Sequence, residues 1–209
     1  MWLGRLDGEF KNPILKRVVE DVSRFAKKQG FEVTVDIIGD GPGFSDIVSF
    51  CKKYNYLHFI FHKEKRGTEL QRIIQVADIG FAMGTSALEI GACYTPIVLL
   101  DASYNKVGKN YRYKWLYEEK GYSVGRSIDS SRDESMGNKH KIEDIFFDFI
   151  DDPAYQAERC YLHVLEHHSV ASLRDKLLNA LSKTEFSFDE AKEQGLFKKP
   201  FWYPLKKTT

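Results

Sequence analysis

Three short segments carry residue types that suit the binding of a phosphate-bearing ligand. The first segment, GRLDGEFKNP at 4–13, contains Arg5 and Lys11. A guanidinium can hold a diphosphate through two parallel hydrogen bonds, and an ammonium can bind it as a point charge. Both side chains should lie at the end of a strand and the start of a helix. The alternative, two solvated loop charges, stays open because most surface bases have no function.

The second segment is GTSALE at 84–89, which follows a predicted buried strand. A helix that begins near 84–86 presents free backbone N–H groups and the positive end of its dipole to a ligand. Gly84 allows backbone to approach a ligand closely, and Glu89 could accept two hydroxyls of a ribose. The alternative is an ordinary helix start, where Glu89 only complements the dipole.

The third segment, IIGDGPG at 37–43, predicts a strand that ends in a tight turn. The alternative is an ordinary turn with no ligand. The chain contains neither the G-x-G-x-x-G fingerprint nor a Walker loop. A nucleotide site built from these segments would therefore be of neither standard type.

The elements that must position these segments alternate over the first hundred residues. Strands are predicted at 2–6, 31–39, 56–61, 78–83 and 96–100, and helices at 11–30, within 41–55, at 68–77 and at 85–93. Such alternation indicates a parallel sheet covered on both faces. We expect a Rossmann-like, doubly wound α/β fold with about six mainly parallel strands, in which ligands bind at the carboxyl ends of the strands.

The pattern changes in the second half of the chain. Residues 102–138 are rich in Tyr, Gly and Ser, with one late strand predicted near 122–124. Residues 141–183 show helical spacing of apolar residues. We expect one domain over 1–185 and a carboxyl-terminal tail over 186–209.

Composition narrows the classes of function. The 209 residues carry 31 Lys and Arg against 30 Asp and Glu, a net charge of +1. This balance argues against a general nucleic-acid or membrane-surface binder. Cys51, Cys93 and Cys160 are odd in number and scattered, which favours a reduced, cytoplasmic chain. No apolar run approaches the ~20 residues that span a bilayer, and no signal-peptide pattern is visible.

Other candidate groups are weaker. Cys160, His163 and His167 share helical spacing, as a metal site would, but one helix cannot supply four ligands, so we expect a helix face and no metal. Cys93 should be a core cysteine rather than a nucleophile. Trp115 and Tyr117 could be core or could face a ligand.

The tail is aromatic. Its side chains could pack on their own domain or reach a partner, and an exposed patch would favour a homo-oligomer. The residues concerned are Phe197, Phe201, Trp202 and Tyr203.

Taken together, the segments resemble the carboxyl-terminal, donor-binding domain of a GT-B fold glycosyltransferase, closest to glycosyltransferase family 4. The resemblance covers residues 2–100 well and the rest loosely. It is carried by GRL at 4–6 with Lys11 and Asn12, GDGP at 39–42, AD at 77–78, Gly84, LEIGA at 88–92 and TPIVL at 95–99.

The resemblance implies the donor-binding half of a hexosyltransferase that moves a sugar from a UDP- or GDP-linked donor to a glycan or glycolipid. Arg5 and Lys11 would bind the diphosphate and stabilise the leaving nucleotide, in place of a metal. Glu89 would hold the ribose, and the base would lie near 61–63. The nucleotide-sugar-binding residues implied are Gly4, Gly39, Asp40, Gly41, His62, Lys63, Gly84, Thr85, Ser86 and Glu89.

Two departures from the family pattern leave other functions open. The family has another glutamate eight positions before Glu89, and that position is Phe81. The acceptor-binding half would precede residue 1, so the chain alone should bind donor but not transfer sugar; the parent enzyme could be membrane-associated. The alternatives are a non-catalytic nucleotide-binding or regulatory module, and a GT-B sugar epimerase, which would need a histidine that none of the three segments contains.

Overall fold

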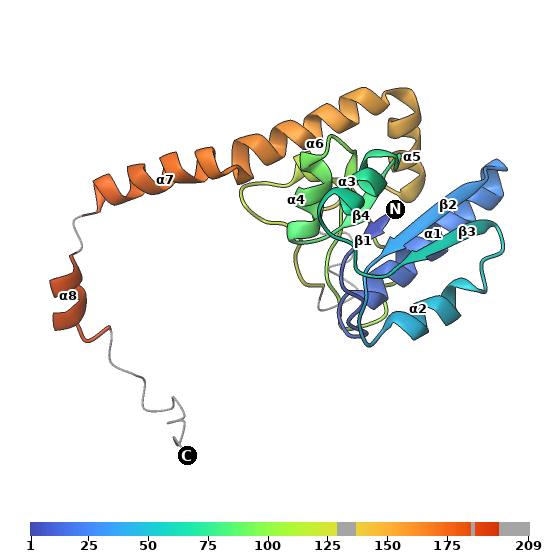
Figure 1. Cartoon of the computed structure of the whole chain (residues 1–209), viewed down its shortest axis with the longest axis horizontal. Helices are drawn as coiled ribbons and strands as arrows, with labels where there is room; N and C mark the ends of the chain where they lie inside the picture. Colours follow the sequence, from blue (N-terminus) through green and yellow to red (C-terminus); the bar gives the residue numbers. More distant parts are fainter. Residues whose placement is uncertain (129–136, 185–186, 197–209) are drawn as a thin grey trace, which may run out of the picture. The chain divides into compact units, whose positions relative to one another are not determined.

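A computed structural model describes residues 1–128, 137–184 and 187–196. Its strands and helices alternate over the first hundred residues, as predicted (Figure 1). The strands are β1 (Trp2–Leu3), β2 (Val33–Ile38), β3 (Leu57–His62), β4 (Gly80–Ala82), β5 (Ile97–Leu99) and β6 (Lys114–Trp115). The helices are α1 (Asn12–Gln29), α2 (Phe44–Cys51), α3 (Gly67–Gln75), α4 (Thr85–Ala92), the short 3₁₀ helix η1 (Leu116–Glu118), α5 (Ile142–Asp151), α6 (Pro153–His168), α7 (Val170–Lys183) and α8 (Phe188–Glu193).

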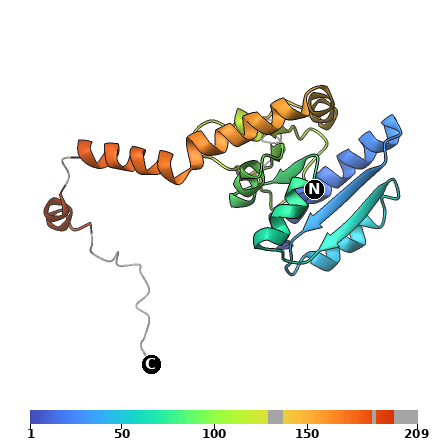
Figure 2. The same ribbon diagram turned by 45° about the horizontal axis from the view of Figure 1, so that its top comes forward.

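The strands form one six-stranded sheet in the order β3-β2-β1-β4-β5-β6. All neighbours are parallel except β6, which pairs with β5 in the antiparallel sense. The two longest strands, β2 and β3, lie side by side (Figure 2). The predicted α/β class with a mainly parallel sheet is confirmed, and the arrangement is consistent with a Rossmann-like fold.

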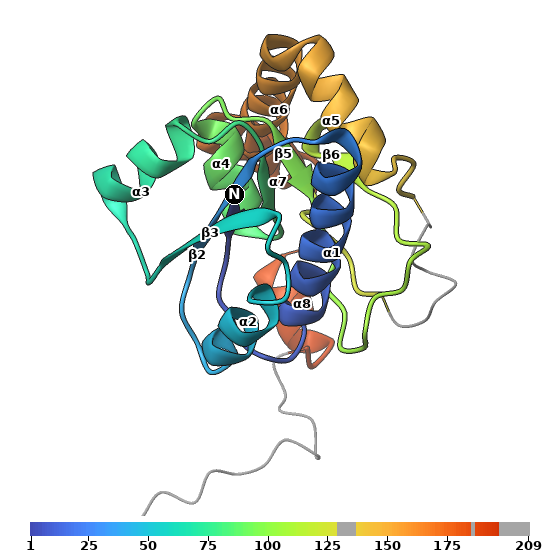
Figure 3. The same ribbon diagram turned by 90° about the vertical axis from the view of Figure 1, so that its right-hand side faces the viewer.

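The sheet is covered on both faces. Helices α1 and α2 lie against one face and α3 and α4 against the other (Figures 1 and 3). This follows from right-handed crossovers, because the chain winds outward through β1, β2 and β3 and then returns to start β4 beside β1. The residues that follow β1, β2, β3 and β4 therefore gather at one edge, the carboxyl edge of the sheet.

Helix α1 shows how the sequence specifies its elements. Its apolar residues recur at helical spacing and are buried against the sheet. Gly30 ends the helix in the left-handed conformation, with φ 73°, as the sequence predicts. Asn12 is the first residue of the helix, and its side-chain amide donates to the Gly43 carbonyl at 3.0 Å.

The prediction of a late strand near 122–124 is wrong. The sixth strand is β6, where Trp115 is fully buried. The segment around 124 instead closes over the start of α4, where the Val124 carbonyl accepts a hydrogen bond from the Gly84 N–H at 2.7 Å. Trp115 is therefore a core residue. Tyr117 is half-buried, and its hydroxyl donates to the Gln156 side chain at 2.8 Å.

The chain divides into two compact units, residues 1–169 and 170–209. The first unit ends at Ser169, whereas the sequence predicts a boundary at 185. The difference arises because α7, although apolar residues recur along it, buries none of its described side chains. In the second unit, Ser187 caps α8 by accepting from the Glu190 N–H. The tail aromatics Phe197, Phe201, Trp202 and Tyr203 lie outside the described residues.

None of the helices within the described ranges is long and apolar enough to cross a membrane.

Candidate functional site

A cavity of about 510 Å³ lies at the carboxyl edge of the sheet. Arg5, which follows β1, and Asp40, which follows β2, contribute to its lining. Ser86 and Glu89 contribute from the first turns of α4. The predicted candidates that line it are Gly4, Arg5, Gly39, Asp40, Ser86 and Glu89. The structure thus brings groups from all three sequence segments to one cavity, of a size that suits a small organic ligand.

The chain that carries Arg5 is held by backbone hydrogen bonds. Beyond the ends of β1 and β2, the Gly4 N–H donates to the Ile38 carbonyl and the Leu6 N–H to the Asp40 carbonyl, both at 3.0 Å. These bonds extend the pairing of the two strands up to the cavity. Arg5 therefore projects from backbone that is fixed on both sides.

The glycines of the GDGP turn are needed for this close approach. A Cβ atom on Gly39 would lie 2.0 Å from the Gly4 carbonyl oxygen, and one on Gly41 would lie 2.3 Å from that of Leu6. Both glycines also have positive φ, 148° and 146°, which disfavours other residues. The turn therefore has a structural role: its backbone packs against residues 4–6 and holds the chain around Arg5.

Three charged side chains of the cavity form no ion pair with any residue in the described ranges, namely Arg5, Asp40 and Glu89. All three are exposed. Asp40 accepts a hydrogen bond from the Gly41 N–H at 2.7 Å, whereas Arg5 and Glu89 make no hydrogen bond within those ranges. Some lysines and arginines elsewhere in this unit pair with carboxylates, as Lys16 does with Asp46 at 2.7 Å. A cation and a carboxylate left unpaired around one cavity leave both free to contact a ligand.

Lys11 lies beside this cavity but does not line it. Its Nζ atom would be 3.8 Å from a Cβ on Gly4, so it reaches the backbone next to Arg5. Burial lowers the pKa of Lys11; the nearby Asp7 carboxylate opposes that shift, and the Arg5 charge adds to it. The two cations therefore influence each other across Gly4.

The start of α4 differs in part from the expectation. The Gly84 N–H is not free, because it donates to the Val124 carbonyl. The N–H groups of Thr85 and Ser86 donate to no other group within the described part of the chain. Of the residues at 84–86, only Ser86 lines the cavity. Two backbone donors remain available for an anion where the sequence suggested three.

The end of β3 is also placed differently. His62 and Lys63 do not line the cavity. The His62 Nε2 atom instead lies 2.6 Å from the Asp36 carboxylate, and Lys63 is an exposed side chain. His62 lies on the same face of the sheet as its register partner Ile38, which lines the cavity, but its ring is held by the Asp36 carboxylate on that face.

The residues that line the cavity at this point are Glu64, Lys65, Arg66 and Gly67. Arg66 pairs with Glu64 at 2.5 Å, and Lys65 pairs with Glu69 at 2.5 Å. The signal that could have identified them is the charge run KEKR just beyond the strand.

Phe81 occupies the position where the resembled family has its other glutamate. It lies inside β4, opposite Trp2 of β1 and Val98 of β5, and is 5% exposed. The chain passes from β4 to α4 through only Met83 and Gly84. A carboxylate at position 81 would be in the core, so this strand supplies no acid to the cavity.

Asp101 is a carboxylate that the sequence analysis missed. It follows β5, is fully buried, and accepts hydrogen bonds from the Asn138 amide at 2.8 Å, the Tyr111 hydroxyl at 3.3 Å and the Arg126 N–H at 3.2 Å. Burial, together with the Asp101 charge, raises the pKa of Tyr111 well above its ordinary value. The network positions the 124–126 segment, and within that segment the Val124 carbonyl accepts the hydrogen bond from the Gly84 N–H.

The cysteine and histidine candidates lie away from this cavity. His163 is buried, and its ring centroid is 4.7 Å from that of His167. Burial, with the nearby histidines, lowers the pKa of His163 to about 4. No group of three or more His, Cys, Asp or Glu residues within the described ranges is arranged to hold a metal ion. Cys93 is half-buried, and burial raises the pKa of its thiol.

The sequence matches no protein-family model. No curated protein matches it at a significant level either. The function of the chain therefore has to be inferred from the cavity and the groups around it.

Proposed function

We propose that this chain binds a nucleoside diphosphate at the carboxyl edge of its sheet, as the donor-binding half of a glycosyltransferase that uses a UDP- or GDP-linked sugar. The observation that carries the proposal is that Arg5 and Glu89 line one cavity and make no hydrogen bond or ion pair within the described ranges. A nucleoside diphosphate needs both a cation for its phosphates and an acceptor for its ribose hydroxyls.

Each group has a defined role in this proposal. The diphosphate lies between the Arg5 guanidinium and the free N–H group of Ser86, which lines the cavity. Lys11 adds positive charge next to Arg5, so the two cations would stabilise the negative charge that develops on the leaving nucleotide. The Glu89 carboxylate accepts hydrogen bonds from the ribose.

The base is proposed to lie against residues 64–67, which line the cavity beyond β3. This differs from the position near 61–63 that the sequence suggested. Arg66 and Lys65 are paired with carboxylates of their own segment, so this wall is close to neutral. A neutral wall suits an uncharged base better than a further phosphate.

A second candidate is a non-catalytic nucleotide-binding or regulatory module. It is favoured by the burial of Phe81, because β4 then supplies no acid to a donor sugar. Both candidates require the same nucleotide pocket, and they differ in whether the sugar is recognised.

The pocket is tested by calorimetric titration of the chain with UDP, GDP, ADP and CMP. We expect one diphosphate to bind at sub-millimolar concentration. Arg5→Ala should weaken it at least about tenfold, the value of one charge-assisted hydrogen bond. Glu89→Ala should weaken the nucleotide but leave inorganic pyrophosphate unchanged. Lys63→Ala is the matched control, an exposed cation outside the cavity, and should have no effect. Failure of every nucleotide to bind the folded chain would overturn the proposal.

Sugar recognition separates the two candidates. UDP- or GDP-linked glucose, galactose, mannose and N-acetylglucosamine are titrated against the diphosphate that binds. A donor site should prefer one sugar over its epimer by about tenfold, the value of one or two polar contacts. A module that contacts only the nucleotide should bind all of them with the affinity of the free diphosphate.

A further inference from the structure

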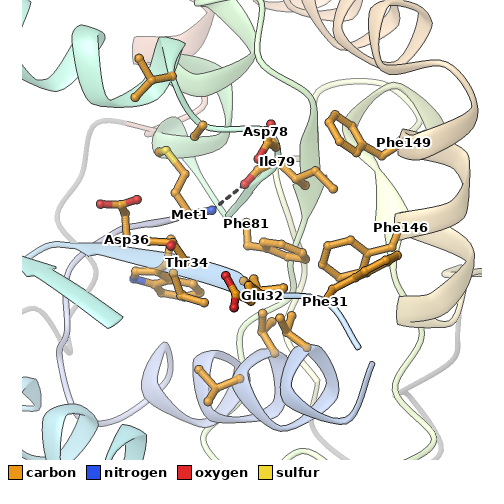
Figure 4. A pocket seen from close by; sticks show the side chains of 18 of the residues that line it. Met1, Phe31, Glu32, Thr34, Asp36, Asp78, Ile79, Phe81, Phe146 and Phe149 are labelled. Atoms are coloured by element: carbon orange, nitrogen blue, oxygen red, sulfur yellow. Dashed lines mark hydrogen bonds between the residues drawn. The ribbon is translucent and has the colours of Figure 1, made fainter. Parts of the chain in front are cut away.

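A second cavity, of about 640 Å³, lies at the opposite, amino-terminal edge of the sheet (Figure 4). Helix α1 contributes Val18 and Val22 to its walls, and α5 contributes Phe146 and Phe149. The Phe81 side chain from β4 also reaches it. It shares no lining residue with the candidate nucleotide cavity. The proposed nucleotide function leaves this cavity unexplained.

Apolar side chains at this cavity remain exposed to water. Phe31 is 43% exposed, Ile150 53% and Val76 82%, and all three line the cavity. Covering apolar surface is worth about 25 cal/mol per Å². Exposed apolar groups gathered around a hollow are typical of binding sites. The cavity therefore suits a ligand with an apolar body.

The charged side chains of the cavity are all acidic. Glu32, Asp36 and Asp78 line it, and no Lys, Arg or His does. Glu32 and Asp78 make no hydrogen bond or ion pair with a residue in the described ranges. The one basic group is the Met1 amine, which donates to the Ile79 carbonyl at 2.6 Å (Figure 4). Burial lowers the pKa of that amine to about 6, although the Asp36 and Asp78 charges oppose the shift.

The field in the cavity is therefore negative at neutral pH. The Met1 amine is then mostly uncharged, whereas Glu32 and Asp78 have no cationic side-chain partner in the part of the chain that the structure describes. Asp36 has the neighbouring His62, whose ring nitrogen lies 2.6 Å away outside the cavity. A cationic ligand would be attracted, and an anionic one would be repelled.

The aromatic lining adds to this preference. Five aromatic side chains line the cavity, namely Trp2, Phe31, Phe81, Phe146 and Phe149. The faces of aromatic rings are negative and attract ammonium groups, as in sites that hold quaternary or alkylated amines. Rings and carboxylates without a basic side chain form a combination that selects for a cation on an apolar body.

We propose that this cavity binds an organic ammonium compound, a ligand with an aromatic or aliphatic body and one alkylammonium group. The body is buried between α1 and α5, and the ammonium group faces Glu32 and Asp78. A neutral apolar ligand is the competing occupant, and the two are distinguished by charge alone.

Three probes with the same indole body test the proposal. Tryptamine is a cation, tryptophol is its neutral counterpart, and indole-3-acetate is an anion. Affinities are measured by calorimetry or ligand-observed NMR at pH 7.5. We expect tryptamine to bind about tenfold more tightly than tryptophol, the value of one charged contact with partial desolvation. Indole-3-acetate should bind more weakly than either. Equal binding of tryptamine and tryptophol, or no binding of tryptamine at millimolar concentration, would overturn the proposal.

Substitutions of the lining residues test whether tryptamine binds in this cavity. Asp78→Asn and Glu32→Gln change exposed rim positions, so the fold should persist, and each should weaken tryptamine about threefold while leaving tryptophol unchanged. Glu158→Gln, at an exposed carboxylate of α6 that does not line the cavity, is the matched control. Val22→Trp should fill the cavity and abolish the binding of both tryptamine and tryptophol. Loss of tryptamine binding in Arg5→Ala, or its retention in every cavity variant, would assign it elsewhere and reject the proposal.

Discussion

The two edges of one sheet differ in chemistry and in how they are built. At the carboxyl edge, Arg5 and Glu89 are left unpaired around a cavity whose backbone is held by strand-like hydrogen bonds. At the amino-terminal edge, apolar and aromatic side chains of α1 and α5 meet the beginnings of the strands. Direction explains part of the contrast, because in a parallel sheet every turn that leads from a strand into a helix lies at the same edge.

The contrast also shows what each kind of edge requires of the sequence. The carboxyl edge needs glycines, since the turns after β1 and β2 pass within contact distance of each other. The amino-terminal edge needs apolar volume, and Val18, Val22 and Phe149 do not fill it completely. The first edge should therefore respond to backbone changes and the second to side-chain size and charge.

The largest effect is expected from Gly39→Ala. The added Cβ would lie 2.0 Å from the Gly4 carbonyl oxygen, so the free energy of unfolding should fall by about 3 kcal/mol or more. Gly67→Ala is the matched control, with φ 56° but no atom within 4 Å of a Cβ, and should cost about 1 kcal/mol. Urea unfolding measures both. Equal losses would mean that close approach does not shape the carboxyl edge.

The amino-terminal edge should make stability depend on pH. The Met1 amine has a pKa of about 6 in the folded chain against 8.0 ordinarily, so the unfolded chain binds more protons between pH 6 and 8. This contribution is fully present above pH 8 and is lost as the pH falls through 6, by about 2–3 kcal/mol in all. After acetylation of the amine, the free energy of unfolding measured with urea should no longer show this dependence on pH. An unchanged pH dependence after acetylation would contradict the prediction.

Replacement of Arg5 by lysine should have a smaller effect than its removal. Arg5→Lys keeps the charge but loses the planar fork, so diphosphate affinity should fall by about threefold to tenfold, or about 1 kcal/mol. Glu158→Gln and the cavity variant Asp78→Asn should leave the same affinity unchanged. An effect of Asp78→Asn on the diphosphate would mean that the two edges are coupled.

Small increases in apolar side-chain volume should change stability in opposite directions at the amino-terminal edge and in the core. Val22→Ile adds one methylene that can enter the open cavity, and it should stabilise the fold by about 0.5–1 kcal/mol. Val98→Ile adds the same group in β5, where Val98 is fully buried and lines neither of the two cavities, and it should destabilise the fold by about 1 kcal/mol. Thermal unfolding of both variants tests the difference. A change in stability in the same direction for both variants would contradict this prediction.

Sequence reasoning was most successful where a local pattern has one physical solution. The alternation of apolar strands with amphipathic helices predicted β2, β3 and α1 to within a few residues. The predicted helix over 11–30 ends at Gly30, whose left-handed conformation favours glycine. The segments around Arg5, Asp40 and Glu89 were predicted to share one edge, and they do share one cavity.

It was less successful where the outcome depends on distant partners. The Gly84 N–H is occupied because Val124, forty residues on, closes over it. His62 faces Asp36 instead of the cavity. The strand expected near 122–124 forms at β6, and the first compact unit ends at Ser169 because α7 buries no described side chain.

The sequence by itself determined the α/β class, the strand-to-helix turns and the residue types that reach the carboxyl edge, because these follow from periodicity and from glycine conformation. Only the tertiary structure decided which charges stay unpaired. It also decided that Lys65 and Arg66 replace Lys63 at the cavity, that Asp101 is buried, and that an acidic, aromatic hollow lies at the amino-terminal edge. Pairing, burial and cavities depend on contacts between residues far apart in the chain, which no local pattern records.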